Sequence, residues 1–221
     1  MAHETHAKTL PADLSAPAFV DGWKSRAMIV GVVFSVIAAL LAFADGSIEH
    51  VLRAWVLGLM LTFGFSVGGL ALLMVQYCSG GKWGLLLRRP LEAMSRTLPL
   101  VFVYWVVVAL EMKKLYLWAQ LTSESDTAAA LKSGLINEIQ AHCLDFKRPM
   151  LNPASFVWVS VLCFAIWGFY TWRLNVLALK RDADSPDNTP FCSKKWENIS
   201  GPGIVVYSFT MTAAAIYWVM S

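Results

Sequence analysis

The chain has 221 residues, of which 57% are hydrophobic and only 15% are charged, and its formal net charge is +3. A soluble domain cannot bury this much apolar surface, whereas lipid can cover it. The basic residues form no run of the kind that binds nucleic acid. The composition therefore excludes a soluble enzyme and predicts an all-α, polytopic transmembrane bundle.

Five apolar segments predict membrane spans, because about 20 helical residues cross the ~30 Å hydrocarbon core. The segments cover residues 27–44, 51–77, 99–112, 155–179 and 203–220. The third could extend to Tyr116. A rival interpretation of the first segment is a signal peptide cleaved after Ala44, but the preceding 1–26 is long for its basic region. We therefore expect 27–44 to be a span.

The basic residues predict the orientation. With segment 1–26 in the cytoplasm, twelve of the 18 lysines and arginines lie on the cytoplasmic side, as the positive-inside rule prefers. Tryptophans near both ends of the spans form two interfacial belts. We expect a multi-pass protein of the bacterial inner membrane with a cytoplasmic N-terminus.

Three connections between the spans have patterns of their own. Residues 82–97 mix apolar and basic side chains, with Pro90 suited to a first helical turn. They predict either a helix in the cytoplasmic interface or a plain positive anchor. In 113–153, four residues at helical spacing predict an amphipathic helix: Leu131, Leu135, Ile139 and Cys143. Residues 180–198 are expected to form a loop, and Gly201-Pro202-Gly203 to begin the last helix.

The cysteines and histidines argue against a redox centre in this chain. The four cysteines form neither a CxxC nor a CxxCH motif, and none of the four histidines lies in the middle of a span. Iron–sulfur clusters, zinc and haem need such ligands. We expect no cofactor to be bound by this chain alone and no metal site.

A few polar residues within or near the spans are candidates for binding quinone or moving protons. Glu111 is either a proton acceptor or a side chain that reaches water. The hydroxyls of Tyr104 and Tyr207 either bind a ligand carbonyl or bond to a neighbouring helix. Arg173 either extends to the interface or pairs with a carboxylate on a partner.

The second span carries several glycines. Gly64 and Gly68 form a small-xxx-small pattern, which predicts close helix packing. The alternative is a flat ring ligand lying against the glycines.

Three stretches carry a resemblance to a known family. Residues 77–100 read YCSGGKWGLLLRRPLEAMSRTLPL, residues 115–120 read LYLWAQ with Leu-Asn-Pro following at 151–153, and residues 199–221 read ISGPGIVVYSFTMTAAAIYWVMS. Together they resemble the F-type membrane subunit of alternative complex III, the second quinone-binding subunit of a bacterial quinol:cytochrome c oxidoreductase. Leu117 departs from this pattern, which has proline there.

The resemblance implies a fold related to the membrane subunits of polysulfide and nitrite reductases. That fold has about ten spans, in two four-helix bundles flanked by single helices. The five spans here would be one flanking helix and the first bundle. We therefore expect the chain to be a fragment, the N-terminal half of such a subunit.

The resemblance also implies a role and partners. The chain would support the membrane arm of a respiratory complex, with quinone or quinol as a candidate ligand. Its partners would be other membrane subunits together with iron–sulfur and multihaem cytochrome c subunits. Two alternatives stay open, namely a membrane scaffold or assembly protein and half of a solute transporter.

Overall fold

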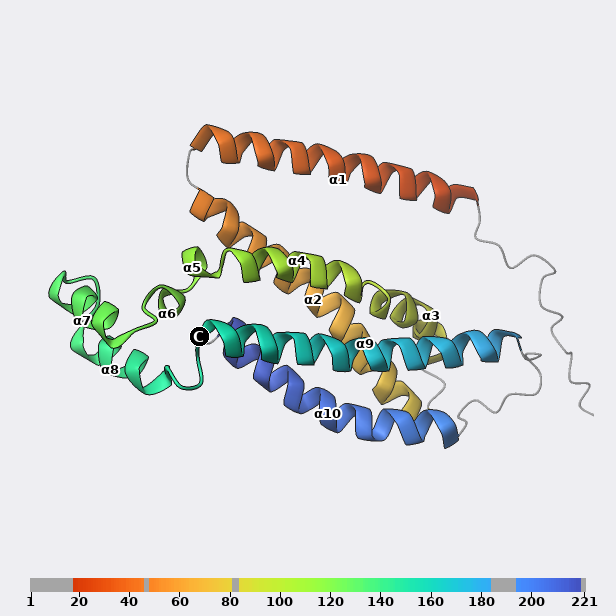
Figure 1. Cartoon of the computed structure of the whole chain (residues 1–221). Helices are drawn as coiled ribbons and strands as arrows, with labels where there is room; N and C mark the ends of the chain where they lie inside the picture. The colour runs from red at the N-terminus through yellow and green to blue at the C-terminus, as the bar shows by residue number, and fades with distance from the viewer. Residues whose placement is uncertain (1–17, 46–47, 81–83, 184–193, 220–221) are drawn as a thin grey trace, which may run out of the picture. The chain divides into compact units, whose positions relative to one another are not determined.

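A computed structural model describes residues 18–45, 48–80, 84–183 and 194–219, and every regular element within these ranges is an α-helix (Figure 1). The fold class predicted from the sequence is confirmed. The helices are α1 (Ala18–Asp45), α2 (Ile48–Ser79), α3 (Gly84–Ser95), α4 (Leu98–Leu110), α5 (Met112–Leu115), α6 (Leu117–Gln120), α7 (Glu124–Lys132), α8 (Glu138–Lys147), α9 (Pro153–Ala183) and α10 (Lys194–Trp218).

The contacts divide the chain into two units, Met1–Val51 and Leu52–Ser221. The first unit contains α1, a helix of 28 residues that includes the predicted span 27–44. The second unit contains most of α2 and all later helices. The expected cytoplasmic segment 1–26 lies mostly outside the described residues.

Within the described residues, four helical stretches are long and apolar enough to cross a membrane: His50–Ser79, Leu87–Leu110, Pro153–Lys180 and Lys195–Trp218. Each overlaps one of the last four predicted spans. The chain is therefore a multi-pass membrane protein. The expected extension of the third span to Tyr116 is interrupted, because α4 ends at Leu110 and the backbone at Tyr116 is extended, with φ −117° and ψ 124°.

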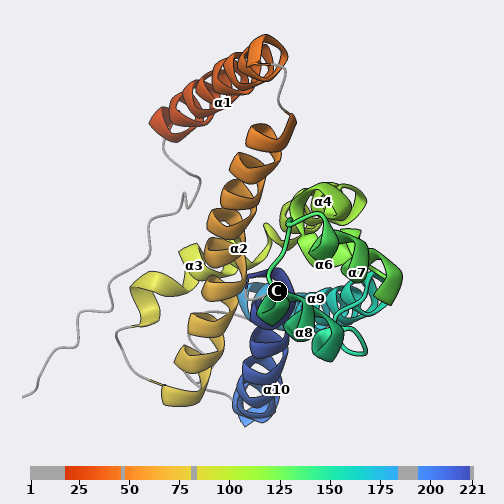
Figure 2. The ribbon, with the colours of Figure 1, turned by 90° about the vertical axis from the view of Figure 1, so that its left-hand side faces the viewer.

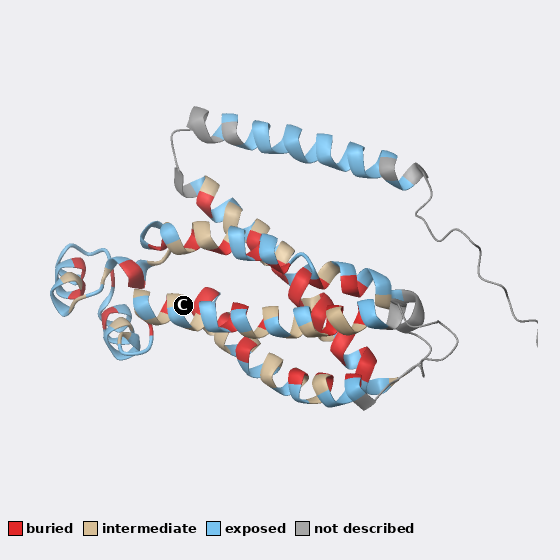
Figure 3. Ribbon diagram, turned by 45° about the vertical axis from the view of Figure 1, so that its right-hand side comes forward, coloured by how far each residue is buried: buried red, intermediate tan, exposed pale blue. Residues whose placement is uncertain are grey.

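The core of the second unit lies between α2, α4, α9 and α10, whose buried residues form one hydrophobic cluster (Figure 3). Helices α9 and α10 are antiparallel neighbours (Figure 1). Aromatic rings from several helices meet in this core: Trp105, Phe156, Phe164, Trp167 and Trp218. Without a hydrophobic force between helices in lipid, such packing supplies much of the association energy.

Two local expectations about helix starts were wrong. Helix α3 begins at Gly84, so Pro90 lies in its interior instead of its first turn. Helix α10 begins at Lys194 and runs through Pro202. The early start of α10 has a tertiary cause, because the buried Trp196 ring lies 4.3 Å from the ring of Tyr77 on α2. The expected loop at 180–198 is helical at both ends, and its middle lies outside the described residues.

The connection between α4 and α9 holds short helices instead of one amphipathic helix. Gly134, with φ +73°, separates α7 from α8 and breaks the predicted stripe after Leu131. Positive φ suits glycine, which has no Cβ to clash. Each of the two helices begins with a capping box, centred on Ser123 and Asn137. Figure 2 views the second unit from the end where α7 and α8 lie.

Tyr116 fastens this connection to the end of α10. Its hydroxyl donates a 2.9 Å hydrogen bond to the carbonyl of Trp218. Burial raises the pKa of Tyr116 from 10.0 to about 12. The unfolded chain therefore releases this proton at lower pH than the folded chain does.

We expect this difference to make stability depend on pH in alkaline solution. Because the folded pKa is the higher one, the contribution is complete below pH 10 and is lost between pH 10 and about 12. Two pKa units correspond to about 2–3 kcal/mol. Unfolding of the wild type and of Tyr116→Phe should be followed in detergent at pH 8, 10 and 11.5. The phenylalanine variant should be less stable at pH 8 and should lose less stability above pH 10. Parallel curves for the two proteins would contradict this expectation.

Candidate functional site

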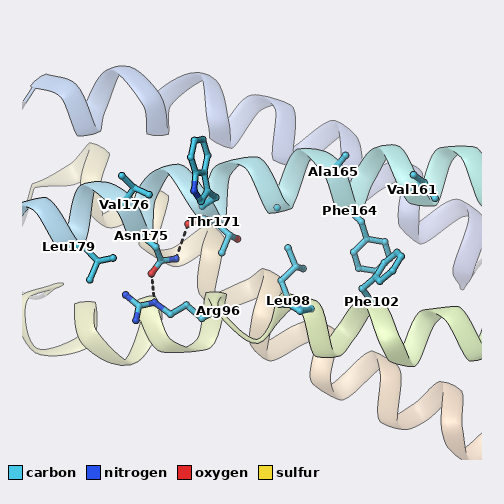
Figure 4. A pocket seen from close by; sticks show the side chains of 13 residues that line it. Arg96, Leu98, Phe102, Val161, Phe164, Ala165, Thr171, Asn175, Val176 and Leu179 are labelled. Atoms are coloured by element: carbon cyan, nitrogen blue, oxygen red, sulfur yellow. Dashed lines mark hydrogen bonds between the residues drawn. The ribbon is translucent and has the colours of Figure 1, made fainter.

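A groove of the second unit lies between α4 and α9 and has a volume of about 820 Å³ (Figure 4). Its walls are almost entirely apolar. Small-molecule sites in proteins occupy roughly 300–1,000 Å³, so the groove has room for a ligand. The lining residues are Arg96, Leu98, Pro99, Phe102, Val161, Phe164, Ala165, Gly168, Thr171, Trp172, Asn175, Val176 and Leu179.

The polar groups of the groove gather near one end, where Arg96 meets Asn175 (Figure 4). Arg96 lies in the turn between α3 and α4, and its Nε donates a 2.6 Å hydrogen bond to Asn175 Oδ1. The Asn175 side chain is held in turn, because its Nδ2 donates to the Thr171 carbonyl at 2.8 Å and to Ser95 Oγ at 3.3 Å. Asn175 is only 8% exposed. The guanidinium is thus fixed at the groove by a buried amide.

The rest of the Arg96 guanidinium is available to a ligand. Among the described residues, its two terminal nitrogens have no hydrogen-bond partner, and no carboxylate lies within 4.0 Å of it. Arginine presents these nitrogens as a fork that matches carboxylate and phosphate oxygens. The site can therefore hold an amphiphile with an acceptor-rich or anionic head.

A second polar cluster lies on α2 and α3, away from the groove lining. Glu92 is 2% exposed, and its Oε1 accepts a 3.1 Å hydrogen bond from Tyr77 while its Oε2 lies 3.7 Å from Arg89 Nη1. Gln76, one residue before Tyr77, is fully buried, and neither polar atom of its side chain has a partner within the described part of the chain. Glu92 was not among the polar candidates predicted from the sequence.

The four polar candidates from the sequence lie apart. Glu111 is the C-cap residue of α4 and forms a 2.7 Å ion pair with Lys114, with its side chain 39% exposed. Tyr104 stacks on Trp55 of α2 at 4.7 Å, and its carbonyl accepts a 2.9 Å hydrogen bond from the Trp55 indole. Glu111 thus lies in an exposed pair, and the ring of Tyr104 lies in a helix contact.

The other two candidates also lie in separate surroundings. Arg173 lies on α9, 5.9 Å from the ring of Trp172. Tyr207 lies on α10, half-buried against the core. In the ranges that the structure describes, no hydrogen bond, ion pair or ring contact joins any two of the four candidates. The structure does not assemble them into one site.

A packing role for Gly64 and Gly68 stays a prediction. A Cβ added at either glycine would meet no described atom within 4 Å. At Gly69 it would lie 2.9 Å from Met94 Cβ on α3, and at Gly203 it would lie 2.9 Å from Cε1 of the Tyr170 ring on α9. Side chains on other helices therefore decide where a glycine is needed for close packing, and a sequence pattern within α2 cannot reveal those contacts.

The described residues contain no group of three or more histidine, cysteine, aspartate or glutamate side chains arranged to hold a metal ion. No protein-family model matches the chain, and no curated protein matches it. The functional argument therefore depends on the chain's own residues.

Proposed function

We propose that the chain is an integral membrane subunit of a respiratory quinol:electron-acceptor oxidoreductase of the alternative complex III type, in the bacterial inner membrane with its N-terminus in the cytoplasm. It supports the membrane arm, and the redox centres belong to its partners. One observation supports this proposal most: the residues that resemble the family's motifs are those that join the helices of the second unit.

The first motif stretch, 77–100, joins α2, α3 and α9. Its buried side chains include Leu91 and Leu98, and Met94 lies against Gly69. Its polar residues make the Tyr77–Glu92 and Arg96–Asn175 hydrogen bonds. The basic and acidic residues of this stretch thus hold helices in place, as a motif required for a fold would.

The other motif stretches meet at the far end of the same bundle. Tyr116 of the second stretch donates to the Trp218 carbonyl of the third. Tyr217 of the third donates a 3.0 Å hydrogen bond to the carbonyl of Met150, which directly precedes the Leu-Asn-Pro sequence. Residues up to 102 positions apart in the chain thus form one set of contacts, which favours a supporting role for these stretches.

A supporting role also accords with the scattered polar candidates. Quinol is oxidised beside an iron–sulfur subunit, and electrons pass to multihaem cytochrome c subunits. A quinone-binding or proton-transfer role for Glu111, Tyr104, Arg173 and Tyr207 stays a prediction. Quinone or quinol is then a ligand of the whole complex.

The proposal predicts which other subunits co-purify with the chain. The affinity-tagged full chain, extracted from its own membranes in mild detergent, should co-purify with iron–sulfur and multihaem subunits. The preparation should show c-type haem absorbance and reduce cytochrome c with quinol, and an untagged strain serves as the control. A chain that purifies in the same detergent without haem would contradict the proposal and favour a scaffold. Uptake of a solute by vesicles containing the chain alone would favour the transporter alternative.

A further inference from the structure

We propose that the groove between α4 and α9 is a binding site for an anionic phospholipid. The phosphate lies on the guanidinium of Arg96, and one acyl chain lies along the apolar walls. This inference depends on the groove alone and goes beyond the respiratory role proposed above.

The head of the site is built for an anion. Asn175 uses its carbonyl oxygen to hold Arg96 Nε, and its amide nitrogen is already bonded to Thr171 and Ser95. The arginine fork is therefore fixed in place before a ligand arrives, with its two terminal nitrogens unpartnered within the described residues. A cation next to a low-dielectric surface is stabilised by a charged partner more than by a neutral one. A phosphate supplies both the charge and paired oxygens.

The tail of the site is long enough for an acyl chain. From Asn175 the lining residues continue along α9 to Val161, fourteen positions away, which is roughly 21 Å of helix. An acyl chain spans half of the hydrocarbon core, which is about 15 Å, so the groove is long enough to hold one. Phe102 and Phe164 form the wall toward the far end, and Gly168 leaves space between them and Arg96.

The surroundings place the head near the membrane surface. Trp172 lines the groove and is 60% exposed, with Arg173 next to it. Lys180 follows on the same helix and is exposed. Tryptophan and basic residues concentrate at the level of the lipid headgroups, and anionic lipids are attracted to such basic surfaces. A neutral quinone head would leave the Arg96 charge without a counter-charge.

The test measures ligand binding to the delipidated full chain in detergent by native mass spectrometry. Four ligands distinguish the contribution of the phosphate head from that of the acyl chains: phosphatidylglycerol, diacylglycerol with the same chains, glycerol 3-phosphate and ubiquinone. We expect phosphatidylglycerol to bind at least about tenfold more tightly than diacylglycerol. Glycerol 3-phosphate, which has no acyl chain, should bind no more tightly than diacylglycerol. Ubiquinone should not displace the phospholipid.

Two variants probe the two halves of the site. Arg96→Gln should weaken phosphatidylglycerol binding about tenfold or more, whereas Arg53→Gln, an exposed arginine on α2, should leave it unchanged. Gly168→Leu should also weaken binding by filling the groove, because a Cβ there meets no described atom within 4 Å. Gly64→Leu, equally open, is its control.

Three results would overturn the proposal. They are equal binding of phosphatidylglycerol and diacylglycerol, unchanged binding by Gly168→Leu, and displacement by ubiquinone, which would assign the groove to quinone. If Arg96→Gln fails to fold, two tests still decide whether the groove binds an anionic phospholipid. They are the comparison of the four ligands on the wild type and the binding of phosphatidylglycerol to Gly168→Leu.

Discussion

Replacing Gly69 with alanine is expected to destabilise the second unit, although alanine is the better helix former. The new methyl carbon would lie 2.9 Å from Met94 Cβ, and the Leu91 carbonyl lies 3.7 Å away. Met94 Cβ is attached directly to the α3 backbone, so it cannot move without moving the helix. Overpacking of this kind costs about 1–3 kcal/mol.

The matched control is Gly64→Ala, five residues earlier on α2. Its Cβ would meet no described atom within 4 Å, and alanine gains up to about 1 kcal/mol of helix propensity over glycine. Gly69→Ala should therefore lower the midpoint of thermal unfolding in detergent. Gly64→Ala should raise this midpoint or leave it unchanged. Equal losses of stability for both would show that α3 does not pack against Gly69 as described.

Removing the indole of Trp167 is expected to have the largest effect of any single truncation in the core. Its side chain is 1% exposed, and its ring centroid lies 5.3 Å from Phe63, 5.6 Å from Phe164 and 6.1 Å from Trp218. The indole nitrogen donates a 3.0 Å hydrogen bond to Thr210 Oγ1 on α10. Trp167→Ala would leave a cavity at the meeting point of three helices and would remove the hydrogen bond that the Thr210 hydroxyl accepts.

A buried tryptophan replaced by alanine costs about 3–5 kcal/mol. We expect this loss for Trp167→Ala in reversible denaturation, followed by intrinsic fluorescence or helicity in mixed micelles. Trp167→Phe keeps a ring but loses the hydrogen bond, so it should fall between wild type and alanine. Trp158→Ala, a tryptophan on the same helix that is mostly exposed, should have little effect. A small change for Trp167→Ala would contradict the described core.

The last four spans were predictable from the sequence, because length and apolar content are properties of a single segment. The start of α10 was not, since it depends on the contact of the Trp196 ring with the ring of Tyr77, more than 100 residues earlier. Likewise, the break at Gly134 depends on one backbone angle that a spacing pattern cannot express.

The candidate site was less predictable than the fold. Arg96 was interpreted only as one of the basic residues facing the cytoplasm, and Asn175 was not recognised at all. A single asparagine in an apolar helix can be assigned to a site only when its hydrogen-bond partner is known, and that partner is 79 residues away in the sequence. The polar candidates that the sequence did single out lie in separate contacts instead.

The Arg96–Asn175 contact also sets an order of events during synthesis. Ribosomes add roughly 5–20 residues per second, so Arg96 leaves the ribosome several seconds before the 79 residues leading to Asn175 have followed. During that interval α3 and α4 have no α9 to receive the guanidinium. The early helices are therefore synthesised without the buried amide that later holds Arg96. Slowing translation between these positions should lengthen that interval without changing the final fold.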